Sequence, residues 1–490
     1  MDNRIDEIYL RIEKGRAIIL GLGISNRPLV DFLQKSGAKN IAVYDKKTYD
    51  ELLPYSEQLL KMGVDLHLGV DFLSDLYRAQ DAEHTVVFRS PGFREDLPEI
   101  ADIIRRGAIL YSEMEMFIDL TSATVVGITG SDGKTTTTTL IYKMLEKQTE
   151  AQKVGKVYVG GNIGEPLLPY VHNMKKEDFA VVELSSFQLQ TMKRSPVISV
   201  ITNITPNHLN WHVDMNEYAT AKKNIYIHEP NRAVILNAEN EYTASYALDC
   251  GRAVTLFSSK RTGYANIVPN GLKNATAIYI KNGKITYCDG ETETFVINIS
   301  DIRLPGMHNV ENCMCAIGAL WGIVELQYMR EIATTFGGVE HRLEYVDKVN
   351  GIEYYNSSID SSPTRTAAAL SAFCKKPLII CGGYDKHIPF EPLALTLCER
   401  AKIVVLTGAT MQKIRDAIEA CPEYANSELY VIEEKDFNKA FEKINEFAKE
   451  GDIVLLSPAC ASFDAFSNFE ERGKCFKDLV YKLKDKTVIH

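Results

Sequence analysis

Apolar residues along the chain fall into short continuous runs, separated by stretches in which they recur every three or four positions. The run RAIILGLG (16–23) predicts a buried strand that enters a tight turn, and PLVDFLQKSG (28–37) has the spacing of an amphipathic helix. The run NIAVYD (40–45) predicts a second strand. This strand–helix–strand unit indicates a parallel sheet covered by helices.

The same alternation continues to the carboxyl end and predicts three consecutive α/β domains, at residues 1–122, 123–338 and 339–490. Residues 250–303 are richer in short strands and turns, which indicates an antiparallel flank on the second sheet. The further runs that predict strands are TVVFRS (85–90), AILYS (108–112), ATVVGIT (123–129), FAVVEL (179–184), ISVITN (198–203), IEYYN (352–356), PLIICGG (377–383), KIVVLTG (402–408), ELYVI (428–432) and DIVLLS (452–457).

Length and composition agree with several cores in one ordinary globular chain. The 490 residues exceed what a single core usually holds, and 45% of them are hydrophobic and 24% charged. The net charge is −10, from 55 basic and 65 acidic residues, which argues against a protein that coats nucleic acid. A local basic pocket could still hold phosphates.

Neither a secretion signal nor a membrane span is predicted. The amino terminus, MDNRIDEIYLRIEKG, is charged and amphipathic, and no apolar stretch approaches the roughly 18 residues that cross a bilayer. The ten cysteines include no CxxC pair, so buried free thiols in a reducing cytosol are favoured over a metal site. These features predict a cytoplasmic protein without membrane insertion.

The strongest motif is GITGSDGKTT (127–136), which follows an apolar run and opens a helical pattern. Gly130 and Gly133 let backbone N–H groups converge on phosphate oxygens, and the start of the helix adds its positive dipole end. Lys134 can reach the terminal phosphates, and the threonine hydroxyls that follow it can bind Mg²⁺. The motif therefore indicates ATP or GTP, without specifying the reaction.

A weaker glycine motif, GLGISN (21–26), follows the first predicted strand. It lacks the third glycine of a dinucleotide-binding fingerprint, although Asp45 ends the second strand where a ribose-binding acid would lie. A turn whose amides face a nucleotide diphosphate and a structural turn without a ligand both fit this pattern. A dehydrogenase would require bound NAD and is disfavoured.

Three further side chains are candidates for a metal site. Glu183 and His208 each follow a predicted strand, at the sheet edge where ligands gather in α/β proteins. A carboxylate and a neutral imidazole suit Mg²⁺ or Mn²⁺, although either residue alone could be structural. Lys222, in the helical pattern MNEYATAKKNIY (215–226), cannot ligate a cation as an ammonium, whereas a carbamate formed with CO₂ could. A solvent-exposed lysine is the ordinary interpretation of that pattern.

Eight motifs, in this order, resemble the Mur ligase family over nearly the whole chain. They are GITGSDGKTT, GGNIGEPLL (160–168), VVELSSFQLQ (181–190), NITPNHLNWH (203–212), LPGMHNVEN (304–312), EHRLEYV (340–346), GGYDK (382–386) and SPACASFDAFSNFEERG (457–473). The ELSSFQL and SPACASFD segments resemble the D-glutamate-adding members. The resemblance implies a Rossmann-like amino-terminal domain that binds UDP, a central ATP-binding domain with a phosphate loop and a mostly parallel sheet, and a Rossmann-like carboxy-terminal domain that brings the amino acid.

The resemblance also implies roles for individual residues. The implied ATP site comprises Gly130, Ser131, Asp132, Gly133, Lys134, Thr135, Thr136, Asn309, Asn312 and Arg342. The implied UDP-substrate site comprises Ile24, Ser25, Asp45, Ser90, Asn162 and His208, and the implied D-glutamate pocket comprises Ser361, Lys386, Ser462, Phe463 and Phe469. The implied metal ligands are Thr135, Glu183, His208 and Lys222 as a carbamate, and the implied catalytic residues are Lys134, His208, Lys222 and Arg342.

The implied reaction joins D-glutamate to UDP-N-acetylmuramoyl-L-alanine at the expense of ATP, a step of peptidoglycan precursor synthesis. Phosphoryl transfer makes an acyl phosphate, whose oxygens Lys134, Arg342 and Mg²⁺ would stabilise. The amine then attacks, and His208 could accept its proton. Domain closure must bring the reacting groups within about 3 Å. The implied partners are these small molecules, with no nucleic acid and a monomeric chain.

Positions in YYNSSIDSS (354–362) depart from the family pattern. Ser357, Ile359 and Asp360 stand where the family often has Asp, Lys and Ala, so affinity for nucleotide and amino acid is open, and Asp360 could restore a carboxylate. Residues 206–207 are Pro-Asn where an acidic pair is common. Two alternatives therefore stay open: a Mur-type ligase for another amino acid, and a nucleotide-binding paralogue with impaired turnover.

Overall fold

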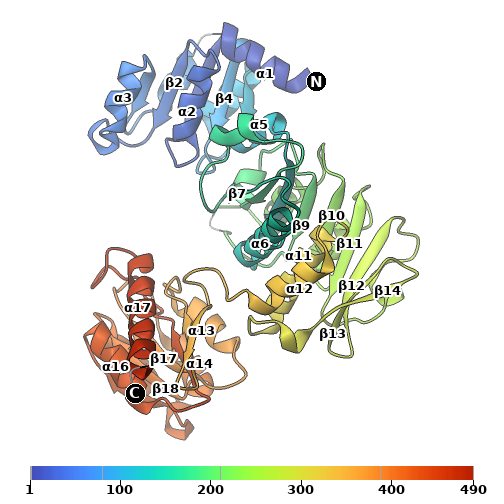
Figure 1. Ribbon diagram of the computed structural model, residues 1–490. Coiled ribbons are helices and arrows are strands. Elements are labelled where there is room, and N and C mark those ends of the chain that lie inside the picture. Colours follow the sequence, from blue (N-terminus) through green and yellow to red (C-terminus); the bar gives the residue numbers. More distant parts are fainter. Residues whose placement is uncertain (1–2, 80, 210, 387, 489–490) are drawn as a thin grey trace. The chain divides into compact units, whose positions relative to one another are not determined.

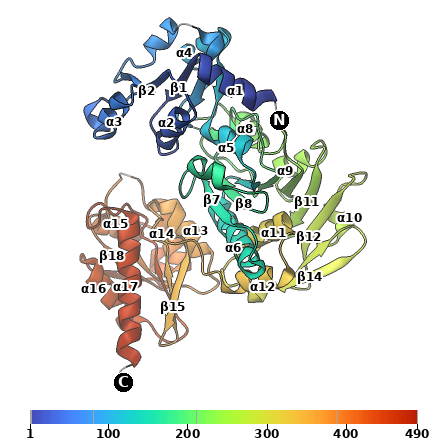
Figure 2. The same ribbon diagram turned by 45° about the horizontal axis from the view of Figure 1, so that its top comes forward.

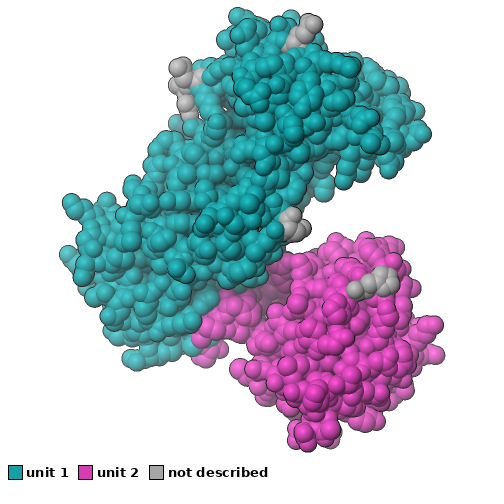
Figure 3. Space-filling view, turned by 180° about the vertical axis from the view of Figure 1, so that it is seen from behind, with its two compact units in different colours: residues 1–299, 311–332 teal, residues 300–310, 333–490 magenta. Residues whose placement is uncertain are grey.

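The computed structural model describes residues 3–79, 81–209, 211–386 and 388–488, and it contains three sheets with helices packed against them (Figure 1). The predicted fold class, an α/β chain with mostly parallel sheets in three domains, is confirmed. Contacts divide the chain into two compact units, residues 1–299 with 311–332 and residues 300–310 with 333–490 (Figure 3). The first unit holds the first two sheets and the second unit holds the third. The domain boundaries at 122 and 338 stay predictions.

The first sheet has five strands in the order β3-β2-β1-β4-β5. All of them are parallel, as the strand–helix–strand pattern predicts, and β1 and β2 are labelled in Figure 2. The chain moves outward from β1 in one direction and then from β4 in the other, so the carboxyl ends of β1 and β4 form a switch point where α/β proteins bind ligands. The elements are α1 (Asn3–Lys14), β1 (Arg16–Leu20), α2 (Asn26–Lys35), β2 (Ile41–Asp45), α3 (Tyr55–Lys61), β3 (Asp65–Leu68), β4 (Thr85–Arg89), α4 (Pro98–Arg105) and β5 (Ile109–Tyr111).

The second sheet has nine strands in the order β14-β13-β12-β11-β10-β9-β6-β8-β7. Strands β6 to β12 are parallel, and β12, β13 and β14 form an antiparallel meander. The strands are β6 (Thr124–Thr129), β7 (Val157–Gly161), β8 (Phe179–Glu183), β9 (Ile198–Ile201), β10 (Ala233–Asn237), β11 (Ala253–Ser258), β12 (Ala275–Lys281), β13 (Lys284–Cys288) and β14 (Glu293–Asn298). The helices are α5 (Glu113–Leu120), α6 (Lys134–Gln152), α7 (Ser186–Leu189), α8 (Met215–Lys223), α9 (Glu241–Tyr246), α10 (Tyr264–Ile267), α11 (Met307–Leu320) and α12 (Leu326–Thr335).

The antiparallel flank begins later than the sequence predicts. β11 lies within the predicted flank but pairs in parallel with both β10 and β12. The helices α9 and α10 connect β10, β11 and β12 as crossovers, which return the chain in the same direction each time. The chain first reverses at the tight turn after β12 and reverses again after β13, so the prediction of an antiparallel segment starting at residue 250 is wrong for its first part.

The third sheet has six strands in the order β15-β16-β20-β17-β18-β19, and only the β15–β16 pair is antiparallel. Helices α14 and α15 pack on one face and α16 and α17 on the other, each with its own apolar core. The elements are β15 (Glu344–Val349), β16 (Ile352–Asn356), α13 (Pro363–Ser371), β17 (Leu378–Gly382), α14 (Glu391–Arg400), β18 (Ile403–Thr407), α15 (Met411–Glu419), β19 (Tyr430–Glu433), α16 (Phe437–Phe447), β20 (Ile453–Leu456) and α17 (Phe469–Val488).

Two predictions about the chain as a whole can be compared with the structure. All ten cysteines are free thiols, but only six are buried and Cys374 is exposed, so burial holds for part of the set. Among the described helices, none is both long and apolar enough to span a membrane.

Candidate active site

The glycine-rich loop connects β6 to α6 at the carboxyl edge of the second sheet. Gly130 and Gly133 have φ values of +150° and +79°, in the region that favours glycine. A β-carbon at Gly130 would collide with the Thr202 hydroxyl, and one at Gly133 would collide with the Asn312 amide oxygen. The loop therefore requires glycine at both positions, which keeps its backbone N–H groups accessible at the start of a 19-residue helix.

Residues that follow β9 hold the phosphate loop in place. The Ser131 N–H donates to the Asn203 carbonyl at 2.9 Å, and the Asp132 N–H donates to the Asn203 side-chain oxygen at 3.0 Å. The Ser131 hydroxyl lies 2.9 Å from both the Thr205 carbonyl and the Tyr218 hydroxyl. These bonds hold the loop against the segment that follows β9 and against α8. Ser131 therefore has a structural role in addition to the predicted nucleotide contact.

Lys134 begins α6 and its side chain folds back over the loop. Its ammonium donates to the carbonyls of Gly130 and Ser131, both at 2.9 Å. The charge therefore lies inside the turn where phosphate oxygens would bind. On α11, Asn312 accepts from the Thr137 hydroxyl at 3.3 Å beside Gly133, and the Asn309 amide donates to the Pro305 carbonyl at 2.7 Å.

Three residues from separate motifs meet beside the loop. The Thr135 hydroxyl donates to one oxygen of Glu183 at 2.7 Å, and the Asn162 amide donates to the other at 3.0 Å. Glu183 is only 2% exposed, at the end of β8. A buried carboxylate next to a hydroxyl offers the hard oxygen ligands that Mg²⁺ prefers, so these residues fit the predicted ion. Within the described residues no three His, Cys, Asp or Glu side chains come together, so water and nucleotide oxygens would complete the coordination.

Lys222 is buried, which the sequence pattern does not ordinarily indicate. Its side-chain nitrogen donates to the Gly130 carbonyl at 2.8 Å and to the Thr129 hydroxyl at 3.2 Å, and it lies 4.7 Å from the centre of the Tyr218 ring. Burial, together with the nearby charge of Lys134, holds the pKa of Lys222 well below its usual value. The amine is therefore close to the phosphate loop and inclined to lose its proton.

His208 is exposed and has a positive φ of +55°. Its ring packs in a T-shaped arrangement with the ring of Phe187, with the ring centres 4.8 Å apart. Partial burial and the charges of Lys134 and Lys222 lower the pKa of His208, which keeps the imidazole neutral near pH 7. His208 is thus in the electrostatic neighbourhood of both lysines, while its metal contact stays a prediction.

The predicted UDP residues lie at the switch point of the first sheet. Ser90, at the end of β4, faces Gly21, whose φ is +82°. Ile24 is 78% exposed and Ser25 precedes α2 without a capping hydrogen bond. The Asp45 carboxylate accepts from the backbone N–H groups of residues 22 and 47 at 2.7 and 2.9 Å, so it shapes the glycine turn.

In the second unit, predicted pocket residues come from three different loops. The Lys386 ammonium donates to the Ser361 carbonyl at 3.3 Å. Phe463 is 65% exposed and packs edge-on against Tyr384, with ring centres 6.0 Å apart. Of the other two predicted residues, Ser462 is buried, and Phe469 is the first residue of α17. The rings of Phe469 and His341 pack in a T-shaped arrangement.

The unusual YYNSSIDSS segment is largely buried. Asp360 accepts from the Ser457 hydroxyl at 2.8 Å, and its burial raises its pKa against the opposing effects of Ser357, Ser457 and Arg342. The Ser357 hydroxyl accepts from the Leu343 N–H at 3.1 Å, next to Arg342. The Asp360 carboxylate is thus engaged inside the domain, and whether it replaces a missing carboxylate toward the ligand stays a prediction.

Sequence reasoning missed two buried arginines that support the predicted sites. Arg472 donates to the carbonyls of Ser358 at 2.9 Å and of residues 460 and 461 at 3.1 Å, which holds together the loops that bear Ser361 and Ser462. Arg89 donates to the Phe187 carbonyl at 2.6 Å and to the Thr191 hydroxyl at 3.1 Å. The sequence did offer a signal for Arg89: a charged residue that directly follows the apolar residues of a predicted strand, in TVVFRS, needs polar partners where the strand ends.

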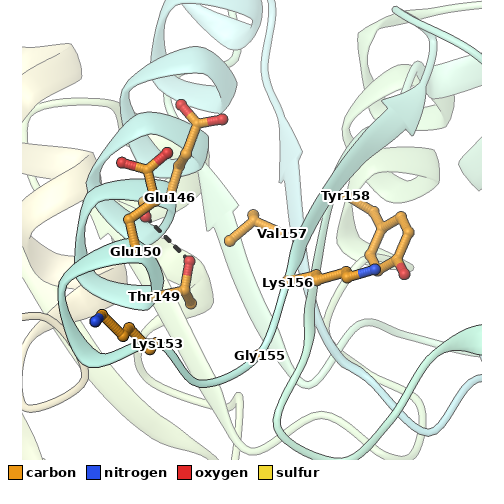
Figure 4. A pocket seen from close by; sticks show the side chains of 8 residues that line it. All are labelled: Glu146, Thr149, Glu150, Lys153, Gly155, Lys156, Val157 and Tyr158. Atoms are coloured by element: carbon orange, nitrogen blue, oxygen red, sulfur yellow. Dashed lines mark hydrogen bonds between the residues drawn. The ribbon is translucent and has the colours of Figure 1, made fainter.

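A cavity of about 480 Å³ lies at the far end of α6 from the phosphate loop (Figure 4). Its walls are the last turns of α6 and the start of β7, with Glu146 and Glu150 on the helix, Lys156 just before the strand and Tyr158 on it. Because α6 rises about 1.5 Å per residue over its length, this cavity is well removed from Lys134. It has no part in the predicted chemistry.

Three α/β domains with a phosphate loop in the middle one are the architecture of an ATP-dependent ligase. The chain belongs to the Mur ligase family: residues 128–320 match the Mur ligase middle domain, and residues 341–460 match the Mur ligase glutamate ligase domain.

Full-length relatives carry a more specific name. The chain is 44% identical over 481 residues to a UDP-N-acetylmuramoylalanine--D-glutamate ligase from Clostridium kluyveri, which covers 98% of this chain and 99% of the relative. It is 40% identical over 487 residues to the protein of the same name from Acetivibrio thermocellus, with 99% and 100% covered.

Solved structures show the same fold at lower identity. A pseudomurein peptide ligase type C from Methanothermus fervidus matches with a TM-score of 0.52 and 19% identity, covering 96% of this chain and 100% of that one. MurF from Acinetobacter baumannii matches with a TM-score of 0.53 and 14% identity, covering 83% and 93%.

Proposed function

We propose that this chain joins D-glutamate to UDP-N-acetylmuramoyl-L-alanine with ATP, in the cytoplasmic synthesis of peptidoglycan precursors. The observation that carries the proposal is the phosphate loop with Lys134 inside it and the Thr135–Glu183 pair beside it, in a chain so similar to ligases of that name. The ELSSFQL and SPACASFD segments favour D-glutamate over other amino acids.

The residues of the second sheet would bind and activate ATP. The N–H groups of the loop and the start of α6 hold phosphate oxygens, and Lys134 turns from its carbonyl partners to the terminal phosphates. Thr135 and Glu183 would hold Mg²⁺, which when bound neutralises charge on the transferred phosphoryl group. The substrate carboxylate would attack the γ-phosphorus of ATP and displace ADP, which gives an acyl phosphate. Oxide cannot leave from a carboxylate, whereas phosphate can leave when the amine attacks the acyl carbon.

The remaining residues would hold the two other substrates. Ser90 and the turn at Gly21 would receive the UDP end, and Asn162 would extend from the Glu183 pair toward the muramoyl part. Lys386 would bind a carboxylate of D-glutamate. His208, kept neutral by its surroundings, would accept the proton of the attacking amine.

Phosphate release tests this proposal directly. Purified protein with UDP-N-acetylmuramoyl-L-alanine, ATP, Mg²⁺ and D-glutamate should release phosphate, and omission of any one component should stop the release. L-Glutamate, L-alanine and a diamino acid serve as matched controls. Activity with one of these in place of D-glutamate would indicate a Mur-type ligase for another amino acid, and ATP binding without any release would indicate an impaired paralogue.

We further expect Lys222 to be carbamylated. Its nitrogen is buried beside Thr129 and Gly130, and as a neutral amine it can attack CO₂, forming an N–C bond and releasing one proton. The carbamate is an anion that could then ligate Mg²⁺. Mass spectrometry of the native protein in bicarbonate should show the mass of one added CO₂, absent in Lys222→Arg and kept in Lys223→Ala. A fully active protein of unmodified mass would contradict this.

A further inference from the structure

His208 begins a short loop, residues 208–209 and 211–213, that we call the histidine loop. Its first residue has a φ of +55°, which a side-chain-bearing residue rarely adopts without support. The N–H groups of Trp211 and His212 both donate to the His208 carbonyl at 3.0 Å, which closes the loop on itself. Phe187 packs against the rings of His208, Trp211 and His212, with centres 4.8, 5.2 and 5.7 Å away.

Glu217, in the first turn of α8, anchors the end of this loop. Its carboxylate accepts from the Val213 N–H at 2.6 Å and from the Gln190 amide at 2.9 Å, and it lies 3.5 Å from the ring of His212. Gln190 in turn accepts from the Trp211 indole N–H at 3.4 Å. One partly buried carboxylate therefore connects the histidine loop, α8 and the segment after α7.

Arg94 completes the arrangement from the first sheet. Its guanidinium donates to Glu217 at 2.8 Å and to the Trp211 carbonyl at 2.7 Å. Arg94 lies in the segment after β4 that also contains Ser90 and Phe93, both of which lie against the glycine turn at Gly21. The pair thus links the predicted UDP-binding edge of the first sheet to the loop that carries His208.

Both partners stay charged near neutral pH. Hydrogen bonds to Asp96 and Glu217 raise the pKa of Arg94. Burial acts to raise the pKa of Glu217, but the hydrogen bonds from Arg94 and Val213 outweigh it and the net pKa is lowered. The ion pair is bidentate and partly shielded from water. Charge-assisted hydrogen bonds of this geometry fix the orientation of both side chains.

We propose that Glu217, paired with Arg94, is a positioning residue for ligation: it fixes the histidine loop so that His208 meets the substrates. The inference deepens the proposed function and rests on it. Glu217 itself touches neither the phosphate loop nor the Thr135–Glu183 pair in the contacts described above. Its loss should therefore impair the step that uses His208 while ATP binding persists, because a shift of about 1 Å can cost about 100-fold in rate.

The kinetic test uses Glu217→Ala, Glu217→Gln and Asp96→Ala. Asp96 is the matched control, since it pairs with the same arginine at 2.8 Å but its side chain is 60% exposed. Glu217→Ala should lower kcat about 30- to 100-fold with KM for ATP within about twofold. Glu217→Gln should recover part of the loss, since its amide oxygen can still accept from Val213, and Asp96→Ala should match the wild type.

A double variant separates positioning from a general loss of folded protein. If Glu217 acts through His208, then Glu217→Ala should cause no further loss in a His208→Ala background. An equal fold-loss in both backgrounds, or no loss in the wild-type background, would overturn the inference.

Trp211 gives a second readout that does not depend on activity. The chain has two tryptophans, so Trp321→Phe leaves Trp211 as the only tryptophan that is excited at the red edge of the absorption band. In that background Glu217→Ala should shift the emission to longer wavelength and increase quenching by acrylamide, and Asp96→Ala should do neither. Unchanged Trp211 emission would overturn the inference. Absence of D-glutamate-dependent phosphate release from the wild type would instead overturn the proposed function.

Discussion

Replacing Lys134 with alanine should reduce ligase turnover about 1,000-fold, or about 4 kcal/mol of transition-state stabilisation. The Lys134 ammonium is the charge that lies inside the phosphate loop, bonded to the carbonyls of Gly130 and Ser131. Without it, negative charge that builds on the transferred phosphoryl group loses the cation that this lysine would supply. Phosphate release at saturating substrates measures the effect.

Lys143→Ala is the matched control, because Lys143 lies on the same helix α6 and its side chain is 44% exposed beside Glu146. It should keep turnover near that of the wild type. Retention of more than about a tenth of the activity in Lys134→Ala would be at odds with the role given to this lysine, since a phosphate contact of that kind is worth far more.

Replacing Glu183 alone with glutamine should lower turnover about 100- to 1,000-fold. It should also raise the Mg²⁺ concentration needed for half-maximal rate. Glutamine keeps the size of the side chain, and its amide oxygen can still accept one of the bonds from Thr135 and Asn162. The variant therefore removes the buried negative charge with little change in packing. A titration of phosphate release against Mg²⁺ measures both effects.

Glu150→Gln provides the comparison for Glu183, because Glu150 lines the cavity at the other end of α6 (Figure 4). It should leave both the rate and the Mg²⁺ requirement unchanged. An unchanged Mg²⁺ requirement in Glu183→Gln would show that the ion binds elsewhere.

Strands buried on both faces were predictable because they appear as continuous apolar runs. The runs at 16–23, 123–129 and 377–383 all became central strands. β3 was missed because its four residues, DLHL, are polar at alternate positions and none is fully buried. The apolar runs therefore identify several buried strands, although the sequence analysis did not predict β10, which is buried inside the second sheet.

The candidate site divides in a similar way. The local motif predicted the phosphate loop, and the position of Glu183 at a strand end predicted that it lies beside the loop. The hydrogen bond from Thr135 to Glu183 agrees with this prediction. The burial of Lys222 was not predictable, because the sequence AKKN is typical of an exposed helical segment. Lys222 is buried because its side chain packs against the phosphate loop. The Arg94–Glu217 pair joins residues 123 apart, and one sequence carries no signal for such a contact.

The most direct test of the account is a crystal structure of the protein with Mg²⁺ and a non-hydrolysable ATP analogue. We predict phosphate oxygens at the N–H groups of residues 133–135 and at the Lys134 ammonium, with the ion on the Thr135 hydroxyl and on Glu183 directly or through one water. A triphosphate bound away from the start of α6, or an ion without contact to Glu183, would contradict the central claim.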